Sequence, residues 1–233
     1  MKKALKTAAR GTVFPYAAEK WVVLEHDPAG RTLCLRLEVI PDKPFDEDNR
    51  NNFAISSSKE WMNGPYLDNL IDAVKGPHAF LQTELDLTAD DGLKDYGTCT
   101  VTIFSLTVDQ YRRNRDVIPL VNDWYWLSTA YSTAANGYEH SARFVWDDGS
   151  LNWCDAYDGR LRPAPRLLSG LRSPDLGRGW RRGHWSRPAG SWHHRRGAGR
   201  TVRRHLRHRG TVRGRGLFPA REAAGHPGEG GGP

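Results

Sequence analysis

Residues 124–127 read WYWL, so that Trp124 and Trp126 alternate with Tyr125 and Leu127. This alternation of large side chains restricts the fold more than any other part of the sequence. Successive side chains of a β-strand point to opposite faces, so Trp124 and Trp126 share one face and the residues between and after them share the other. Further along, residues 142–154 form two runs of alternating aromatic and small residues around an Asp148-Gly149 pair. Asp-Gly favours a tight hairpin turn because these residues tolerate positive φ. The sequence therefore predicts a sheet that contains this strand and this hairpin.

A surface loop is predicted between the strand and the hairpin, from Ser128 to Ser141. The segment is rich in Ser, Thr, Ala, Asn and Tyr but poor in aliphatic residues, so it offers little apolar area for a core. Tyr combined with Ser, Asn and Gly is typical of binding surfaces, in which rigid rings provide contact area and short polar groups adapt their hydrogen bonds. An ordinary wet loop has a similar composition and stays an alternative. The candidate ligand-binding residues, in this loop and beyond the hairpin turn, are Tyr131, Asn136, Tyr138, His140, Asn152, Asp155 and Tyr157.

Several motifs occur in the order found in a known fold family. The sequence WYWL, followed by VWDDGSLNW and by GRLRPA at residues 159–164, resembles the C-terminal part of C-type-lectin-fold domains in bacterial and phage proteins. Upstream, residues 61–64 resemble the family's S-x-x-x-W-L-N helix, and IFSLTVDQY resembles its strand-to-helix step. These domains are related to the formylglycine-generating-enzyme branch and include the variable proteins of diversity-generating retroelements. The resemblance covers about residues 11–165.

The resemblance implies an α+β protein with a C-type-lectin-like fold, in which a mixed or antiparallel sheet is accompanied by two or three helices. It also implies a display protein that binds a protein or cell-surface ligand, as retroelement-diversified receptors do. The enzyme branch uses a reactive cysteine arrangement that the surroundings of Cys34, Cys99 and Cys154 do not match, so no catalytic residue is assigned and the chain is predicted not to be an enzyme. The residues expected in the structural core are Trp61, Trp124, Trp126, Trp146 and Arg162.

Local patterns place further elements before the Trp strand. Residues 21–24 and 32–40 predict a hairpin with one buried side, because its apolar residues alternate. Ser57 and Glu60 have the spacing of a capping box at a helix start, and Thr107 and Gln110 have it too. A helix break is predicted at Gly64-Pro65. The helix that follows is predicted to pack on the core through an apolar stripe that consists of Leu67, Leu70, Ile71 and Val74.

Charge divides the chain near Pro165. The last 68 residues contain 16 Arg, no Lys and three acidic residues, which gives a formal charge of +13 against +7 for the whole chain. Residues 1–165 therefore have a charge of −6 and are numerous enough to form a single core. We interpret residues 1–165 as a ligand-display domain and residues 166–233 as a basic, low-complexity and disordered tail.

Two explanations of the tail remain open. As a functional arm it would bind nucleic acid by neutralising phosphates and stacking rings on bases, and the candidate residues are Arg181, Arg182, Arg195, Arg196, Arg203 and Arg204. Alternatively, the tail is read in a shifted frame of a GC-rich gene, and residues 166–171 then replace the last strand of the core. Nucleic-acid binding through the tail is the alternative to ligand display.

Cofactor, metal and membrane sites are not predicted. The three cysteines are far apart and, with His26, His78 and His140, have no metal-ligand spacing, so we expect reduced and mostly buried thiols. The acidic residues within 84–95 do not follow the EF-hand spacing and are predicted to form a solvated loop. The chain has neither a signal-peptide apolar region nor a run of about 18 apolar residues, which favours synthesis in the cytoplasm with delivery on a virion or surface left open. The sequence leaves the oligomeric state open.

Overall fold

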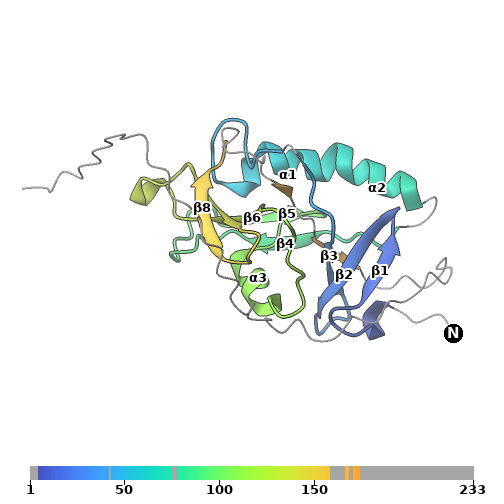
Figure 1. The fold of residues 1–233 in the computed structure, drawn as a ribbon. Coiled ribbons are helices and arrows are strands. Elements are labelled where there is room, and N and C mark those ends of the chain that lie inside the picture. The colour runs from blue at the N-terminus through green and yellow to red at the C-terminus, as the bar shows by residue number, and fades with distance from the viewer. Residues whose placement is uncertain (1–4, 42, 75–77, 158–165, 168–169, 174–233) are drawn as a thin grey trace, which may run out of the picture. The chain divides into compact units, whose positions relative to one another are not determined.

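The structure, a computed structural model, has mixed α and β secondary structure (Figure 1). It describes residues 5–41, 43–74, 78–157, 166–167 and 170–173. The chain divides into two units between Ser191 and Trp192, and every described residue belongs to the first. The α+β class expected from the sequence is confirmed. Arg162 and the predicted disorder of the tail after Ser173 lie outside the described residues.

The first sheet is antiparallel and has the strand order β1-β2-β3-β10. Its strands are β1 (Val13–Tyr16), β2 (Glu19–His26), β3 (Thr32–Arg36) and β10 (Gly170–Ser173). The predicted hairpin forms, but the prediction of one buried side is wrong: Leu33, Cys34 and Leu35 are all buried. These three successive residues all belong to the core cluster, so both faces of β3 are covered.

The second sheet has the strand order β8-β7-β6-β9. Its strands are β6 (Tyr125–Ala130), β7 (Ser141–Val145), β8 (Leu151–Asp155) and β9 (Arg166–Leu167), and only β9 runs parallel to its neighbour. The predicted Asp-Gly hairpin joins β7 to β8, and Gly149 has a φ of 80°, a conformation that suits Gly. Both β9 and β10 come after the domain boundary predicted at Pro165, so paired strands continue to Ser173.

A smaller antiparallel pair precedes the Trp strand. It consists of β4 (Thr83–Asp86) and β5 (Thr98–Val101). The next element is α3 (Val108–Asn114), whose predicted capping box is confirmed: Thr107 Oγ1 accepts from the Gln110 N–H at 3.1 Å, and the Gln110 side chain accepts from the Thr107 N–H at 3.0 Å. These reciprocal bonds satisfy donors that every helix start leaves unpaired.

Most of the remaining helical segments lie between β3 and β4 in the sequence. The remaining segments are η1 (Leu5–Thr7), η2 (Phe53–Ile55), α1 (Ser57–Trp61), η3 (Met62–Tyr66), α2 (Leu67–Val74) and η4 (Ala134–Asn136), and α1 and α2 follow one another along one line (Figure 1). The break predicted at Gly64-Pro65 is confirmed, since Gly64 leaves helical geometry with φ −116° and ψ −109°. Leu70 is buried, and the other members of the predicted stripe pack against the core. No helix in the described ranges has both the length and the apolarity needed to cross a membrane.

The helix start at α1 differs by one residue from the prediction. The N-cap is Ser56, whose buried hydroxyl accepts from the Lys59 N–H at 3.2 Å. Ser57, the predicted cap, is already the first helical residue, and its hydroxyl accepts from the Glu47 N–H at 3.0 Å. Serine suits an N-cap at either position, but only Ser57 has a glutamate three residues later, so the capping-box pattern selected the wrong serine.

Aromatic side chains form much of the core. Trp126 is fully buried, with ring centroids 5.3 Å from Trp124, 5.9 Å from Phe45 and 5.9 Å from Phe144. Trp124 is also buried, which confirms the prediction for this pair. The other two described tryptophans predicted for the core are half-buried and pack at its margin: Trp61 stacks on Tyr66, and Trp146 meets Phe144.

Replacing the two serines at the start of α1 tests the observed cap. We expect Ser56→Ala to lower the free energy of unfolding by about 1 kcal/mol, because a helix N–H loses its acceptor. Ser57→Ala should cost about 0.5 kcal/mol or less, since it removes only an exposed contact. Chemical denaturation of both variants checks the order, and a larger loss for Ser57→Ala would contradict the assignment of the cap.

Candidate functional site

Three aromatic rings meet at the surface beside the β7–β8 hairpin. Tyr131 and Tyr138 come from the β6–β7 loop, and Trp153 comes from the middle of β8. The ring centroids of Tyr131 lie 5.1 Å from Tyr138 and 5.2 Å from Trp153, and those of Tyr138 and Trp153 are 6.4 Å apart. Tyr138 is 42% exposed and Trp153 is 44% exposed. We call these three residues the aromatic surface.

Trp153 is the member that the sequence prediction missed. In the sheet register Trp153 stands opposite Arg143, whereas its neighbour Asn152 stands opposite the buried Phe144. The ring therefore lies on the face opposite to the one that carries Phe144. The sequence contained a signal for this placement. Because Phe144 belongs to the aromatic core, the alternation of side chains along the hairpin places Trp153 on the opposite face.

An ion-pair chain supports the aromatic surface from within. The Arg143 guanidinium lies 5.5 Å from the Tyr131 ring centroid, and its Nη2 is 2.6 Å from Asp90 Oδ2. The other oxygen of Asp90 is 3.1 Å from Arg112 Nη2 on α3. The side chains of Arg143 and Asp90 are only 13% and 12% exposed, so this pair is poorly screened by solvent. It holds the cation against the ring and links the surface to α3.

The β6–β7 loop is organised around one buried side chain, Asn51. Its amide nitrogen lies 2.8, 2.7 and 2.8 Å from the carbonyl oxygens of Ser132, Tyr138 and Ser141. Since an amide has two hydrogens, at least one of them is shared between carbonyls. The amide oxygen accepts from the Tyr96 hydroxyl at 2.7 Å. One residue thus fixes the loop at both of its ends and next to Tyr138.

This arrangement corrects the prediction of a surface loop over the whole of residues 128–141. Residues 128–130 complete β6 and are buried, and Ser141 begins β7. Ser132 and Thr133 are also buried, so the exposed part of the loop is mainly residues 134–138. The buried hydroxyls of Ser132 and Thr133 donate to Asp91 and Asp95, and Asn51 supplies a donor to the Ser132 carbonyl, so these polar groups are satisfied.

The acidic segment predicted to be a solvated loop anchors the β6–β7 loop. Asp91 accepts from the Ser132 hydroxyl and from the Asn136 amide, the latter at 3.0 Å. The Thr133 hydroxyl donates to Asp95 at 2.5 Å. Hydrogen bonding by Ser132 is the main reason why the pKa of Asp91 lies below its usual range, and the Leu93 N–H and the Asn136 amide act in the same direction. Asp91 and Asp95 are exposed, as predicted for a solvated loop, and they also accept hydrogen bonds from the β6–β7 loop.

The other predicted ligand-binding residues do not take part in the ring contacts given above for the aromatic surface. Asn136 is exposed but held by Asp91, and His140 Nδ1 is 2.6 Å from the Asn49 carbonyl oxygen. Asn152 is exposed, and its side chain accepts from the Trp153 N–H at 2.8 Å. Asp155 and Tyr157 are exposed, and in the described part of the chain Tyr157 has no ring contact with the aromatic surface. The six arginines predicted for nucleic-acid binding lie outside the described residues.

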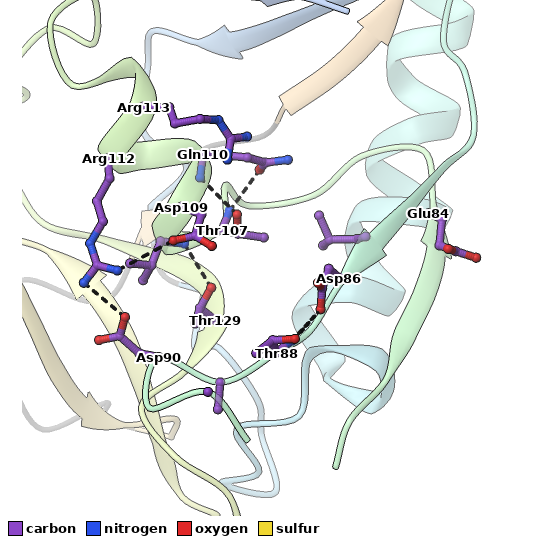
Figure 2. A pocket seen from close by; sticks show the side chains of 14 residues that line it. Glu84, Asp86, Thr88, Asp90, Thr107, Asp109, Gln110, Arg112, Arg113 and Thr129 are labelled. Carbon is purple, nitrogen blue, oxygen red and sulfur yellow. Dashed lines mark hydrogen bonds and ion pairs between the residues drawn. The ribbon is translucent and has the colours of Figure 1, made fainter. Parts of the chain in front are cut away.

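A polar pocket of about 420 Å³ lies next to the same ion-pair chain (Figure 2). In Figure 2 Asp86 contacts Thr88, and Arg112 reaches Asp90 and Asp109. Asp90 therefore lies between this pocket and the aromatic surface. Within the residues that the structure describes, no group of three or more His, Cys, Asp or Glu side chains has the arrangement needed to hold a metal ion. The lining residues are Glu84, Leu85, Asp86, Thr88, Ala89, Asp90, Gly92, Thr107, Val108, Asp109, Gln110, Arg112, Arg113 and Thr129.

The three cysteines are thiols distributed through the fold, as predicted. Cys34 is fully buried, and burial raises the pKa of its thiol. Cys99 is half-buried with a pKa raised for the same reason, and Cys154 is also half-buried. A raised pKa disfavours the thiolate, so Cys34 and Cys99 are poor nucleophiles.

Comparison of the chain with protein-family models, with curated proteins and with solved structures gives no match.

Asn51→Asp tests the organisation of the loop. The change removes both N–H donors and places a carboxylate beside buried carbonyl oxygens, so we expect the free energy of unfolding to fall by about 3 kcal/mol or more. Tyr96→Phe is the matched control, because it removes one hydroxyl from the same network and should cost about 1 kcal/mol. Chemical denaturation measures both, and equal losses in the two variants would contradict a central role for Asn51.

The pKa of Asp91 predicts a loop that loosens in acid. A carboxyl whose pKa is lowered in the folded state stabilises that state above its unfolded pKa of about 4, and this stabilisation is lost as the pH falls through the lower folded value. We expect amide-exchange protection of residues 132–138, corrected for intrinsic exchange, to decrease below about pH 4. In Asp91→Asn this decrease should disappear, whereas Asp147→Asn at the hairpin turn should retain it. An unchanged acid response in Asp91→Asn would show that other groups control the loop.

Proposed function

We propose that the chain is a binding protein that engages a protein or cell-surface ligand through the aromatic surface. The observation that carries this proposal is the contact between two large exposed rings, Tyr138 and Trp153, on a base fixed by Asn51 and by the Arg143–Asp90 pair. Exposed aromatic clusters rimmed by polar groups are typical of interaction sites in soluble proteins. Exposed polar residues close to these rings in the sequence are Asn136 and His140 in the β6–β7 loop and Asp155 on β8, which shares the sheet face of Trp153.

The packing of the rings favours binding on energetic grounds. A ligand that covers a flexible side chain must immobilise it, which costs roughly 0.5–1.5 kcal/mol for each ordered side chain. Tyr138 and Trp153 already contact Tyr131, and Tyr131 lies against the Arg143 guanidinium. Much of this ordering is therefore complete before a ligand arrives, and Tyr and Trp are common among the residues that dominate binding energies.

We further propose that the scaffold is C-type-lectin-like, with display as its role and no catalysis. The order of the Trp strand, loop and hairpin in the sequence supports this assignment, together with the mixed α and β structure. A loop presented by a sheet is the arrangement that retroelement-diversified proteins use to vary their ligand contacts. Delivery on a virion or cell surface would bring such a loop to a cell-surface ligand.

A binding screen with two matched variants tests the proposal. The purified full chain is applied to an array of cell-surface proteins, and each positive interaction is remeasured with Tyr138→Ala and Trp153→Ala. We expect at least one interaction to weaken about 30-fold or more in each variant, which corresponds to about 2 kcal/mol for a dominant contact residue. Both rings are exposed, so the melting temperature of each variant should stay within a few degrees of the parent.

Leu120→Ala is the control for this screen. Leu120 is an exposed apolar residue in the segment between α3 and β6 and does not belong to the aromatic surface. Its replacement should leave binding unchanged. If every interaction survives both aromatic replacements, or is reduced as much by Leu120→Ala, the aromatic surface is not the binding site.

A further inference from the structure

The strand that carries Trp153 is the outermost strand of its sheet. In the order β8-β7-β6-β9, β8 pairs only with β7 among the described strands. Three of its five residues, Asn152, Trp153 and Asp155, are exposed. An edge strand presents a row of backbone N–H and C=O groups to which another extended chain can pair.

The sheet register identifies which backbone groups face outward. The Trp146 N–H donates to the Ser150 carbonyl at 2.9 Å, and the Ala156 N–H donates to the His140 carbonyl at 2.8 Å. Hydrogen-bonded pairs in an antiparallel ladder recur at every second residue, so Asn152 and Cys154 also use their backbone groups toward β7. The backbone groups of Leu151, Trp153 and Asp155 therefore point away from β7.

Among the residues that the structure describes, carboxylates are exposed at both ends of this edge. Asp147 and Asp148 are exposed at the hairpin turn, and Asp155 is exposed at the other end of β8. Of the described basic groups nearby, Arg143 pairs with Asp90, and Arg115 donates to the Asp148 carbonyl at 3.3 Å. A ligand segment lying along β8 would meet carboxylates at both of its ends and the Trp153 ring in between.

From these observations we infer that the ligand contributes an extended, basic polypeptide segment that pairs with the outer edge of β8 while its side chains contact the aromatic surface. This inference rests on the proposed function and adds the mode of binding and the charge of the partner. Strand addition supplies affinity through main-chain hydrogen bonds, and the side-chain contacts supply specificity. An arginine or lysine of the segment beside Trp153 would also gain a cation–π contact.

The same acidic edge disfavours a second copy of this chain as the occupant. Edge-to-edge pairing of two β8 strands would bring the carboxylates of both hairpins close together, and like charges on adjacent strands are destabilising. Asn152 further protects the edge, because its side chain occupies the Trp153 N–H. A ligand segment must displace this short local contact, which a backbone carbonyl can do with an equivalent hydrogen bond.

Selected peptides and a pair of substitutions at one position test the inference. Linear peptides that bind the purified full chain are selected from a random displayed library, and their affinities are measured for the parent, Asp155→Asn and Asp155→Pro. Asp155→Pro removes the carboxylate and an outward N–H but keeps the ladder to β7, whereas Asp155→Asn removes the charge and keeps the N–H. We expect the selected peptides to have a net positive charge. Their affinity should fall a further tenfold or more in Asp155→Pro relative to Asp155→Asn, because proline removes a hydrogen-bond donor and prevents close approach of the peptide backbone.

A second measurement protects the test against misfolding of the proline variant. Each selected peptide is resynthesised with N-methyl groups at successive residues, which block backbone pairing without changing charge. Strand addition predicts that N-methylation lowers the affinity strongly at alternate peptide residues only. An affinity that does not depend on which residue is methylated would overturn the inference. The inference would also be overturned if none of the selected peptides depends on β8 for binding.

The outcomes separate this inference from the proposed function. Peptides that require Tyr138 and Trp153, but bind Asp155→Pro and Asp155→Asn equally and tolerate N-methylation, would leave the aromatic binding site in place and eliminate strand addition. Self-association of the chain that Asp155→Pro abolishes would identify a second copy as the occupant and overturn the basic-segment assignment.

Discussion

Burial of both faces of β6 is the constraint on which the rest of the described fold depends. All six of its residues are buried, so every surrounding element must cover one face or pair with one edge. Phe45 and Phe144 pack against Trp126, while α3 begins against the other end of the strand, where the Thr129 hydroxyl accepts from the Val108 N–H at 3.0 Å. Burying large aromatic side chains contributes several kcal/mol each, which fixes the position of this strand strongly. The β6–β7 loop and the hairpin inherit their placement from it.

Polar contacts then convert this buried strand into a base for an exposed surface. A loop of short polar residues has little apolar area to hold it in place, so its backbone must find donors and its hydroxyls must find acceptors. Asn51 provides the donors, and Asp91 and Asp95 provide the acceptors. Because these partners come from two segments that are distant in sequence from the loop, the loop is ordered by the assembled fold. Tyr138 is exposed in this loop, and its carbonyl is one of the three that accept from Asn51.

Asp90 connects two features that would otherwise be independent. One of its oxygens meets Arg112 at the polar pocket, and the other meets Arg143 beneath the Tyr131 ring. A carboxylate shared by two guanidinium groups, with little exposure to solvent, ties the position of α3 to the aromatic surface. Asp90 is therefore largely buried and shared between two cations, whereas Asp147, Asp148 and Asp155 around the edge of β8 are exposed.

Local patterns in the sequence determined the elements themselves. The alternation around Trp124 predicts β6, the Asp148-Gly149 pair predicts the β7–β8 turn, and the Thr107–Gln110 spacing predicts the start of α3, because each depends on the conformational preferences of neighbouring residues. The same patterns placed the cap of α1 one residue late and treated residues 128–133 as exposed, since burial depends on segments that are distant in sequence. Only the tertiary structure decided that Asn51 meets the carbonyls of Ser132 and Ser141, about ninety residues away, and that Trp153 contacts Tyr131. The physical reason is that hydrogen bonds and ring contacts between remote segments depend on how the whole core packs, which no short window of sequence contains.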